Sequence, residues 1–375
     1  MNRIIKWCRG QPVLIIAFLA AVVTVFIVPP DREYLTYCNT SVLILLFCLM
    51  LAVAGLRSVG VFERITEMLL KKSGNIRRLG LIMMNLCFFS AMLITNDVAL
   101  LTFVPLTLEL FGDTDDDRSL IRMIVLETAA ANLGSMLTPI GNPQNLYIYS
   151  EYGLTASEFE STMLPAGIVS YGILTGLCFG MLDKSPCRTS AAHETAELHK
   201  GRAIGYFAVF LLCIASVLRI LPDIVCLAVS AAAVLVLDRK LFKKADYALL
   251  GTFVCFFVFV GNIARITAVR DFFSEILAEQ ELLISALLSQ VISNVPAAVM
   301  LSGFTENAKA LLLGVDIGGL GTPIASLASL ISYQFYSKSE GSRRGKYMQV
   351  FLAVNFGMLA FLLIFETIML KVFPI

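Results

Sequence analysis

Charged residues are scarce in this sequence: Asp, Glu, Lys and Arg make up 15% of its 375 residues, whereas 58% are hydrophobic. The mean hydropathy is +0.81. A soluble fold of this length could not hide so much apolar surface. Apolar stretches of about 17–25 residues recur between short charged loops, which is typical of polytopic helical membrane proteins. Strand-like alternation is missing, which excludes a β-barrel.

Several chemical signatures are absent as well. The nine cysteines include no CxxC pair and mostly lie in apolar runs, so we interpret them as small buried hydrophobic residues rather than disulfides or metal ligands. His193 and His199 lack HExxH spacing and are interpreted as loop residues. No nucleophile-and-base pairing is visible, so neither enzyme activity nor a nucleic-acid partner is expected.

Two long apolar segments have a polar centre, and the two centres are alike. The first, at about residues 79–111, contains "ITND", and the second contains "ISNV" at residues 292–295. A second pair of segments also matches: "ANLGSMLTPIGNPQNL" aligns without gaps on "VDIGGLGTPIASLASL". In this alignment Asn132 falls opposite Asp316. Both "TPI" runs carry Pro and Gly, which interrupt a helix and release main-chain carbonyls.

The charge distribution places basic loops on one side throughout, so the two units enter the membrane from opposite sides. The sequence therefore predicts an all-α polytopic membrane protein with about nine transmembrane helices plus two re-entrant hairpins, in two inverted repeats with broken helices. Each hairpin is expected to consist of two half-spans of about a dozen residues. The N-terminus and a basic amphipathic stretch at residues 57–78 are predicted to be cytoplasmic.

We divide the chain into four parts on this pattern. Residues 1–40 form a first transmembrane helix and an external loop, and residues 41–183 form the first repeat. Residues 184–246 form a cytoplasmic connector with two linking spans, and residues 247–375 form the second repeat. The expected location is the cell membrane, with the lipid bilayer as the main partner.

The hairpin tips offer a definite chemistry. Thr95, Asn96, Ser293 and Asn294 supply hydroxyl and amide oxygens with little charge, which suits a small hard cation such as Na⁺. Half-helices that begin near Asp97 and Pro296 would present N–H groups and positive dipole ends to an anionic substrate. Each break can face the tip of its own repeat. No cofactor is expected other than Na⁺ itself.

Two residue sets follow from this interpretation. The predicted substrate-binding residues are Thr95, Asn96, Asn142, Gln144, Asn145, Ser293, Asn294, Thr322 and Pro323. The predicted coupling-ion residues, for Na⁺ or H⁺, are Thr95, Asn96, Asp97, Glu127, Gly141, Ser293, Asn294 and Gly321. The competing interpretation is that such polar residues only hold helices together. We favour function because irregular backbone at the midplane is costly without a cavity.

Asp97 breaks the symmetry of the tips, since its counterpart is Val295. It can carry a proton, neutralise a bound cation, or act only as an N-cap of the second half-helix. Glu127 is either a second proton site or an interhelical hydrogen-bonding residue. The three roles of Asp97 and the two roles of Glu127 all stay open.

"ITNDVALLTFVPL", "ANLGSMLTPIGNPQN" and "SNVPAAVML" resemble the signatures of the ion transporter superfamily. That group includes citrate-transporter-like divalent anion/sodium symporters, sodium/proton antiporters and arsenite permeases. The resemblance runs from about residue 41 onward. It implies inverted repeats, an elevator-like movement of a transport domain and, often, a homodimer. Symporter tips read Ser-Asn-Thr, whereas the third, hydroxyl-bearing position is lost here at both tips.

The expected function is therefore secondary active transport of a small anion coupled to Na⁺ or H⁺. The missing tip hydroxyls argue against dicarboxylate recognition, and the "TND" tip is closer to the antiporter and arsenite branches. A Na⁺/H⁺ antiporter or an arsenite-type efflux permease is the alternative within the class. A channel is the alternative from another class, although "GNP" has no match in the second repeat.

Overall fold

The computed structural model describes residues 11–61, 64, 74–111, 116–186, 200–278 and 280–372. The first part of the chain forms α2 (Pro12–Ile27), α3 (Tyr34–Tyr37), α4 (Thr40–Ser58), α6 (Ile76–Ile94), α7 (Asn96–Leu110), α8 (Asp117–Ser135), α9 (Pro143–Glu151) and α10 (Ala156–Met181). The remainder forms α11 (Lys200–Val217), α12 (Asp223–Asp238), the 3₁₀ helix η1 (Arg239–Lys244), α13 (Tyr247–Ala264), α14 (Thr267–Leu277), α15 (Glu281–Ile292), α16 (Asn294–Ser302), α17 (Ala308–Ile317), α18 (Leu327–Lys338) and α19 (Arg344–Val372).

Within these ranges the chain is helical, with one isolated bridge between Asn75 and Pro186 and no strand. Five helices are long and apolar enough to cross a membrane: α4, α6, α10, α13 and α19. Three shorter helices, α2, α11 and α15, are also apolar. Large apolar side chains such as those of Ile204 and Val236 point outward, where a bilayer would cover them. The prediction of an all-α polytopic membrane protein is confirmed.

The first hairpin differs in length from the prediction. Asn75 caps α6 by accepting a hydrogen bond from the Arg78 N–H, so the helix begins at Ile76 and has 19 residues rather than about a dozen. Arg77, expected in the cytoplasmic stretch, lies in the first turn of α6. Its Nε donates to the Leu182 carbonyl at 2.8 Å. The rest of the stretch falls mainly on residues 62, 63 and 65–73, outside the described residues.

Two other predictions also fall outside the described residues. These are the cytoplasmic N-terminus (residues 1–10) and the loop positions of His193 and His199. The domain limits at residues 40, 183 and 246 remain predictions.

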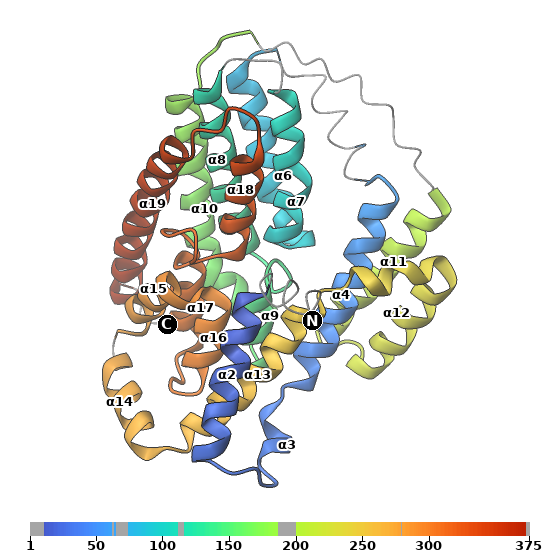
Figure 1. Cartoon of the computed structure of the whole chain (residues 1–375), viewed down its shortest axis with the longest axis vertical. Helices are drawn as coiled ribbons and strands as arrows, with labels where there is room; N and C mark the ends of the chain where they lie inside the picture. Colours follow the sequence, from blue (N-terminus) through green and yellow to red (C-terminus); the bar gives the residue numbers. More distant parts are fainter. Residues whose placement is uncertain are drawn as a thin grey trace.

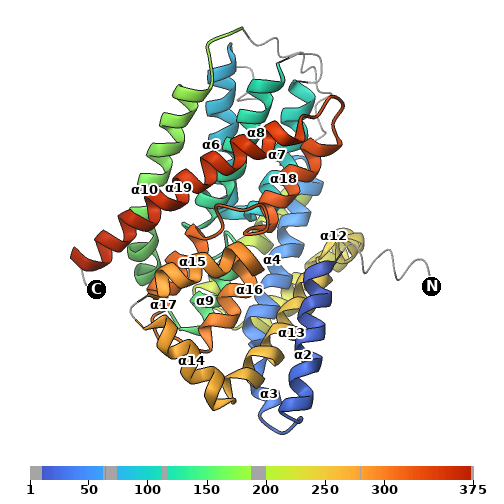
Figure 2. The same cartoon turned by 60° about the vertical axis from the view of Figure 1, so that its left-hand side comes forward.

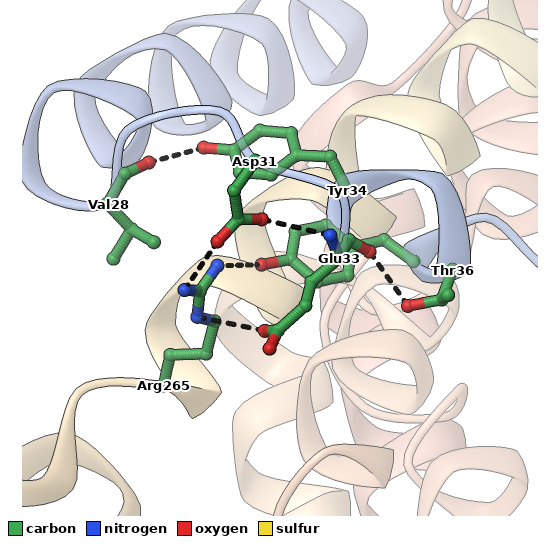
Figure 3. Close-up of polar contacts among 7 residues, drawn as sticks. Val28, Asp31, Glu33, Tyr34, Thr36 and Arg265 are labelled. Carbon is green, nitrogen blue, oxygen red and sulfur yellow. Dashed lines mark hydrogen bonds and ion pairs between the residues drawn. The ribbon is translucent and has the colours of Figure 1, made fainter.

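A frame of five helices, α2, α4, α11, α12 and α13, packs together. Helix α13 packs along α2, and α4 packs against α11 and α12 (Figure 1). One side chain joins α13 to the chain that follows α2 at one end of this frame. The Arg265 guanidinium lies 2.7 Å from the Asp31 carboxylate and 3.2 Å from that of Glu33, and it donates to the Tyr37 hydroxyl at 3.1 Å (Figure 3). Arg265 therefore ties the end of α13 to the loop that follows α2.

The hairpins of the two repeats, with the helix that precedes each break, occupy opposite halves of the molecule. In Figure 1, α6, α7 and α8 lie in the upper half and α15, α16 and α17 in the lower half. After each break the chain changes halves, so that α9 lies low and α18 lies high in both views (Figures 1 and 2). As a result, α18 packs on α7 of the first hairpin, and α9 packs on α16 of the second. Each hairpin is thus covered by a helix of the other repeat.

Candidate functional site

The two hairpin tips have the same backbone conformation. Thr95 has φ 72° and ψ 150°, and Ser293 has φ 74° and ψ 154°. Such angles are nearly restricted to glycine and cost of order 1–3 kcal/mol in other residues. A strained turn at matching positions of both repeats indicates that the surrounding structure holds it there. The next residues, Asn96 and Asn294, begin the second helix of each hairpin.

Each tip is bonded to the break of its own repeat, as the sequence predicts. The main-chain N–H of Asn96 donates to the Gly141 carbonyl at 3.2 Å, and that of Asn294 donates to the Ala325 carbonyl at 2.9 Å. Gly141 and Ala325 are equivalent in the alignment of the breaks. The side chains of both asparagines accept the N–H of the following residue, Asp97 or Val295. Both amide oxygens are therefore turned toward their own helix.

A threonine fastens each break to the helix that precedes the tip. The Thr138 hydroxyl donates to the Met92 carbonyl, and the Thr322 hydroxyl donates to the Gln290 carbonyl at 3.0 Å. In the second repeat the Gln290 side chain adds bonds to the Gly318 and Leu320 carbonyls. Thr322 was predicted to bind substrate, and in the structure its hydroxyl donates to the Gln290 carbonyl.

The side chains of the breaks bond across to the other repeat. Asn132 of α8 accepts the Ser326 hydroxyl at 2.9 Å and donates to the Ser329 hydroxyl at 3.0 Å. Asp316 of α17, the equivalent of Asn132, accepts Asn142 Nδ2 at 2.9 Å and Gln144 Nε2 at 3.1 Å. The contact is reciprocal, because the residue before each break binds the residues after the other break. We call these six residues the repeat clasp.

The clasp also connects the tips. Asn96 Nδ2 donates to Asn132 Oδ1 at 3.1 Å, and the same oxygen accepts the Ser326 hydroxyl. Ser326 follows Ala325, whose carbonyl accepts the Asn294 N–H of the second tip. A Cβ placed on Gly319 would lie 3.0 Å from Asn294 Nδ2, so the second tip lies directly against the backbone of its break. A continuous polar path therefore joins Asn96 to Asn294.

The sequence around the first break explains how α9 starts. Asn142 caps the helix by accepting the Asn145 N–H at 2.9 Å, and Pro143 occupies the first turn, where its missing N–H costs nothing. Asn145 Nδ2 faces the carbonyls of Ser135, Met136 and Thr138 at 3.1–3.3 Å. These donors were expected beside the first tip. In the structure they are buried: Asn145 donates to carbonyls of the break, and Asn142 and Gln144 donate to Asp316.

The predicted site residues thus separate into two groups. Thr95, Asp97 and Ser293 at the tips and Thr322 and Pro323 in the second break are half-buried. The residues of the second group are buried. They are Asn96, Gly141, Asn142, Gln144, Asn145, Asn294 and Gly321.

Asp97 lies in the first turn of α7, and Thr95 rather than Asp97 occupies the N-cap position. A carboxylate there interacts favourably with the positive end of the helix. Glu127 lies apart from the tips. It is fully buried, and its Oε1 accepts the Thr107 hydroxyl from α7. That contact is the interhelical bond considered for it, and Glu127 Oε2 has no hydrogen-bond partner among the described residues.

Asp316 and Asn132 are the residues that the predicted site lacks. The alignment of the repeats already placed Asn132 opposite Asp316, and an acid at the position of an amide was the feature that could have identified them. Their role depends on the closure of one repeat against the other, which a linear alignment does not contain. The buried polar side chains of the described chain include no Lys or Arg, and no cluster of three or more His, Cys, Asp or Glu residues suited to a metal occurs in that part.

Comparison with known proteins agrees with this architecture. An uncharacterized transporter of Methanocaldococcus jannaschii is 36% identical over 294 residues, 76% of this chain and 78% of the relative. The inner membrane protein YbiR of Escherichia coli is 30% identical over 337 residues, 88% of each chain. The silicon efflux transporter LSI3 of Oryza sativa subsp. japonica is 30% identical over 198 residues, 50% of this chain and 40% of that protein.

The apolar helices, the broken-helix site and these relatives define a multi-pass membrane transporter. A family model described as citrate transporter matches residues 4–312. The chain belongs to the citrate transporter family. The predicted resemblance to the ion transporter superfamily is confirmed.

Proposed function

We propose that this protein is a secondary active transporter of the cell membrane that moves a small anion, coupled to H⁺ or Na⁺. The observation that carries the proposal is the pair of strained tips at Thr95 and Ser293, each bonded to the break of its own repeat. Broken helices that meet near the midplane at a repeat interface are the usual binding sites of secondary transporters. Family membership supports transport but leaves the solute open.

The tips supply the means to bind an anion without a cationic side chain. Helices α7 and α16 both begin there, so their positive dipole ends lie at the tips. The half-buried Thr95 hydroxyl adds a donor, whereas the Ser293 hydroxyl already donates to the Ala325 carbonyl at 3.3 Å. Because no Lys or Arg is buried in the described part of the chain, the site suits a small solute of low charge better than a multiply charged one.

Coupling and movement complete the proposal. Carbonyls of the breaks and the tip hydroxyls are the proposed Na⁺ ligands, whereas the buried acids are the proposed proton carriers. The hairpin-bearing helices would move as one body against the frame of α2, α4, α11, α12 and α13, in an elevator-like manner. A homodimer formed through the frame is part of the same proposal.

A second candidate is efflux of a small weak acid by exchange for H⁺. It is supported by the rice relative, which is named a silicon efflux transporter, and by the loss of the third tip hydroxyl in both repeats. Such a solute needs few charged contacts, in agreement with the absence of buried Lys and Arg from the described part of the chain.

The proposal is tested with purified protein in liposomes. A thermal-stability screen against small anions and weak oxyacids, with Na⁺ and pH varied, identifies a ligand, because a ligand that binds only the folded state raises the apparent melting temperature. Uptake of that ligand is then measured under an imposed H⁺ or Na⁺ gradient. We expect accumulation above the external concentration. Flux that only equilibrates the solute would indicate a channel and contradict the proposal.

A further inference from the structure

Two buried oxygen atoms of the repeat clasp and its neighbouring cap face no hydrogen-bond donor in the described part of the chain. They are Asp316 Oδ2 and Asn145 Oδ1. Asp316 is 3% exposed and Asn145 is fully buried. A buried polar atom without a partner costs about 1–3 kcal/mol, so two such atoms in one cluster require an explanation.

The alignment of the repeats indicates that these two atoms belong together. Asp316 is equivalent to Asn132, and Asn145 is equivalent to Ser329. Asn132 and Ser329 are bonded to each other, since Asn132 Nδ2 donates to the Ser329 hydroxyl at 3.0 Å. By the same symmetry, the matching bond of the second pair would run from Asp316 Oδ2 to Asn145 Oδ1. It requires a proton on Asp316, because an ionised carboxylate has no hydrogen atom to donate.

The orientation of Asn145 is fixed by its other contacts. Its Nδ2 faces the carbonyls of Ser135, Met136 and Thr138. Rotating the amide by half a turn would place Oδ1 against these three carbonyl oxygens, which is repulsive. Asn145 Oδ1 can therefore only accept, and an ionised Asp316 can also only accept.

Among the described residues, no charged group bonds Asp316. Helices α8, α9, α10, α15, α16 and α19 pack against α17, and the donors to the carboxyl are the neutral amides of Asn142 and Gln144. Three buried titratable groups of those helices have other partners: Glu127 accepts Thr107, Tyr147 bonds Ser302, and Tyr347 stacks on Tyr336. The other titratable groups, none of which is bonded to Asp316, are Asp117, Arg118, Arg122, Tyr149, Glu151, Glu158, Glu160, Tyr171, Cys178, Glu281, Arg344, Lys346, Glu366, Lys371 and, on α17 itself, Lys309.

We propose that Asp316 is the proton-binding group of this transporter: in the conformation seen here it is neutral, and its Oδ2–H donates to Asn145 Oδ1. This assignment rests on the proposed function and names its coupling ion. Loss of the proton would leave two buried acceptors without a donor and an uncompensated charge on α17. Proton release must therefore accompany a rearrangement of the clasp, which is directly bonded to the first tip through Asn132 and lies beside the second.

Na⁺ fits the same place less well. Two amide N–H donors already point at Asp316 Oδ1, and a bound cation would be repelled by those donors. It would also need several further oxygen ligands, whereas a proton needs only the two oxygen atoms that lack a donor.

Infrared difference spectroscopy of the purified protein in lipid nanodiscs tests the assignment without any transport measurement. We expect the wild-type minus Asp316→Asn spectrum at neutral pH to contain the carbonyl stretch of a protonated carboxylic acid. That band should shift in D₂O and disappear when the pH is raised. Glu127→Gln and Glu366→Gln are matched controls that remove other buried acids and should keep the band.

A difference spectrum with only carboxylate stretches would overturn the assignment, and so would loss of the acid band on adding Na⁺ at constant pH. A second measurement is independent of the band. The amide introduced by Asp316→Asn can donate to Asn145, so this variant should melt at or above the wild-type temperature. It should also lack the fall in melting temperature that the wild type shows as the pH rises from about 4 to the pH at which the acid band disappears. A melting temperature that stays as pH-dependent as that of the wild type would contradict the assignment. If the band is present but no solute is transported, the proposed function fails and this assignment does not.

Discussion

The Arg57 guanidinium donates a hydrogen bond to the main-chain carbonyl of Leu101 at 3.0 Å. Leu101 lies four residues before Pro105, which has no N–H to donate to that carbonyl within α7. Arg57 stands in the last turn of α4. A frame helix therefore satisfies a carbonyl that a proline has released in the first hairpin, and any movement of the hairpin along α4 must break this bond.

The Arg57 contact predicts a specific coupling between two substitutions. Arg57→Ala should lower the free energy of unfolding by about 1–3 kcal/mol, because a carbonyl loses a charged donor. In a Pro105→Ala background the new N–H can serve Leu101, so the same substitution should cost less. A double-mutant cycle on melting in detergent should give a coupling energy of about 0.5–1.5 kcal/mol. Strict additivity would show that Arg57 does not act through this carbonyl.

The repeat clasp predicts that Asn132 matters more than a buried asparagine elsewhere. Asn132→Leu removes bonds to Asn96, Ser326 and Ser329 and leaves buried polar atoms without partners. We expect a loss of several kcal/mol, at about 1–3 kcal/mol for each stranded group. Asn355→Leu is the matched control, since Asn355 is equally buried but bonds only Phe351 of its own helix. Similar losses in the two variants would argue against a structural role of the clasp.

Close contact between helices predicts the effect of two glycine substitutions. A Cβ on Gly134 would lie 2.1 Å from the Phe88 carbonyl oxygen, and one on the equivalent Gly318 would lie 2.8 Å from the Ala286 Cα. Gly134→Ala and Gly318→Ala must push a hairpin away from its break, and each should cost about 1–3 kcal/mol. Gly172 in α10 has nothing within 4 Å of its Cβ position. Gly172→Ala should be neutral or slightly stabilising in the same melting assay.

The contacts of Arg265 with Asp31, Glu33 and Tyr37 predict a pH dependence of stability. The direct hydrogen bond from Arg265 holds the pKa of Asp31 below its ordinary value. A carboxylate with a depressed folded-state pKa stabilises the protein above its unfolded value of about 3.9, and this contribution is lost as the pH falls further. The difference in melting temperature between wild type and Arg265→Gln should be constant near neutrality and shrink below about pH 4.

A matched control for that prediction is Arg270→Gln. Arg270 lies 3.9 Å from the neighbouring Asp271, and both side chains are exposed. Its substitution should change the melting temperature little at any pH. An equal, pH-independent effect of both substitutions would show that the Asp31 contact does not contribute to stability.

Much of the architecture is contained in the sequence. The turns at Thr95 and Ser293 and the two breaks were located from polar residues in apolar runs, because such residues are rare in a membrane without a reason. The apolar helix α2, Pro12–Ile27, lies within residues 1–40, where the first transmembrane helix is expected. The length of α6 was not predictable from hydropathy, since Asn75 caps the helix inside a basic stretch and draws Arg77 into its first turn.

The site was predicted in part. The alignment located both tips and both breaks, and the tip-to-break bonds at Gly141 and Ala325 follow from that pairing. It did not reveal that Asn142 and Gln144 donate to Asp316. Contacts between the repeats depend on how two distant segments close on each other, and periodicity and charge carry no information on that. The role of Asp316 opposite Asn132 is visible only once the reciprocal bonds are seen.

The most direct test of the central claim, that the two tips form the transport site, is solute uptake into liposomes by Asn96→Ala and Asn294→Ala. Each substitution removes a side chain that supports a tip, so we expect both variants to fold and to lose gradient-driven accumulation. Asn85→Ala is the control, because Asn85 lies in α6 away from the tip and bonds Leu81 and Tyr171. It should retain uptake. Wild-type accumulation by both tip variants would contradict the account.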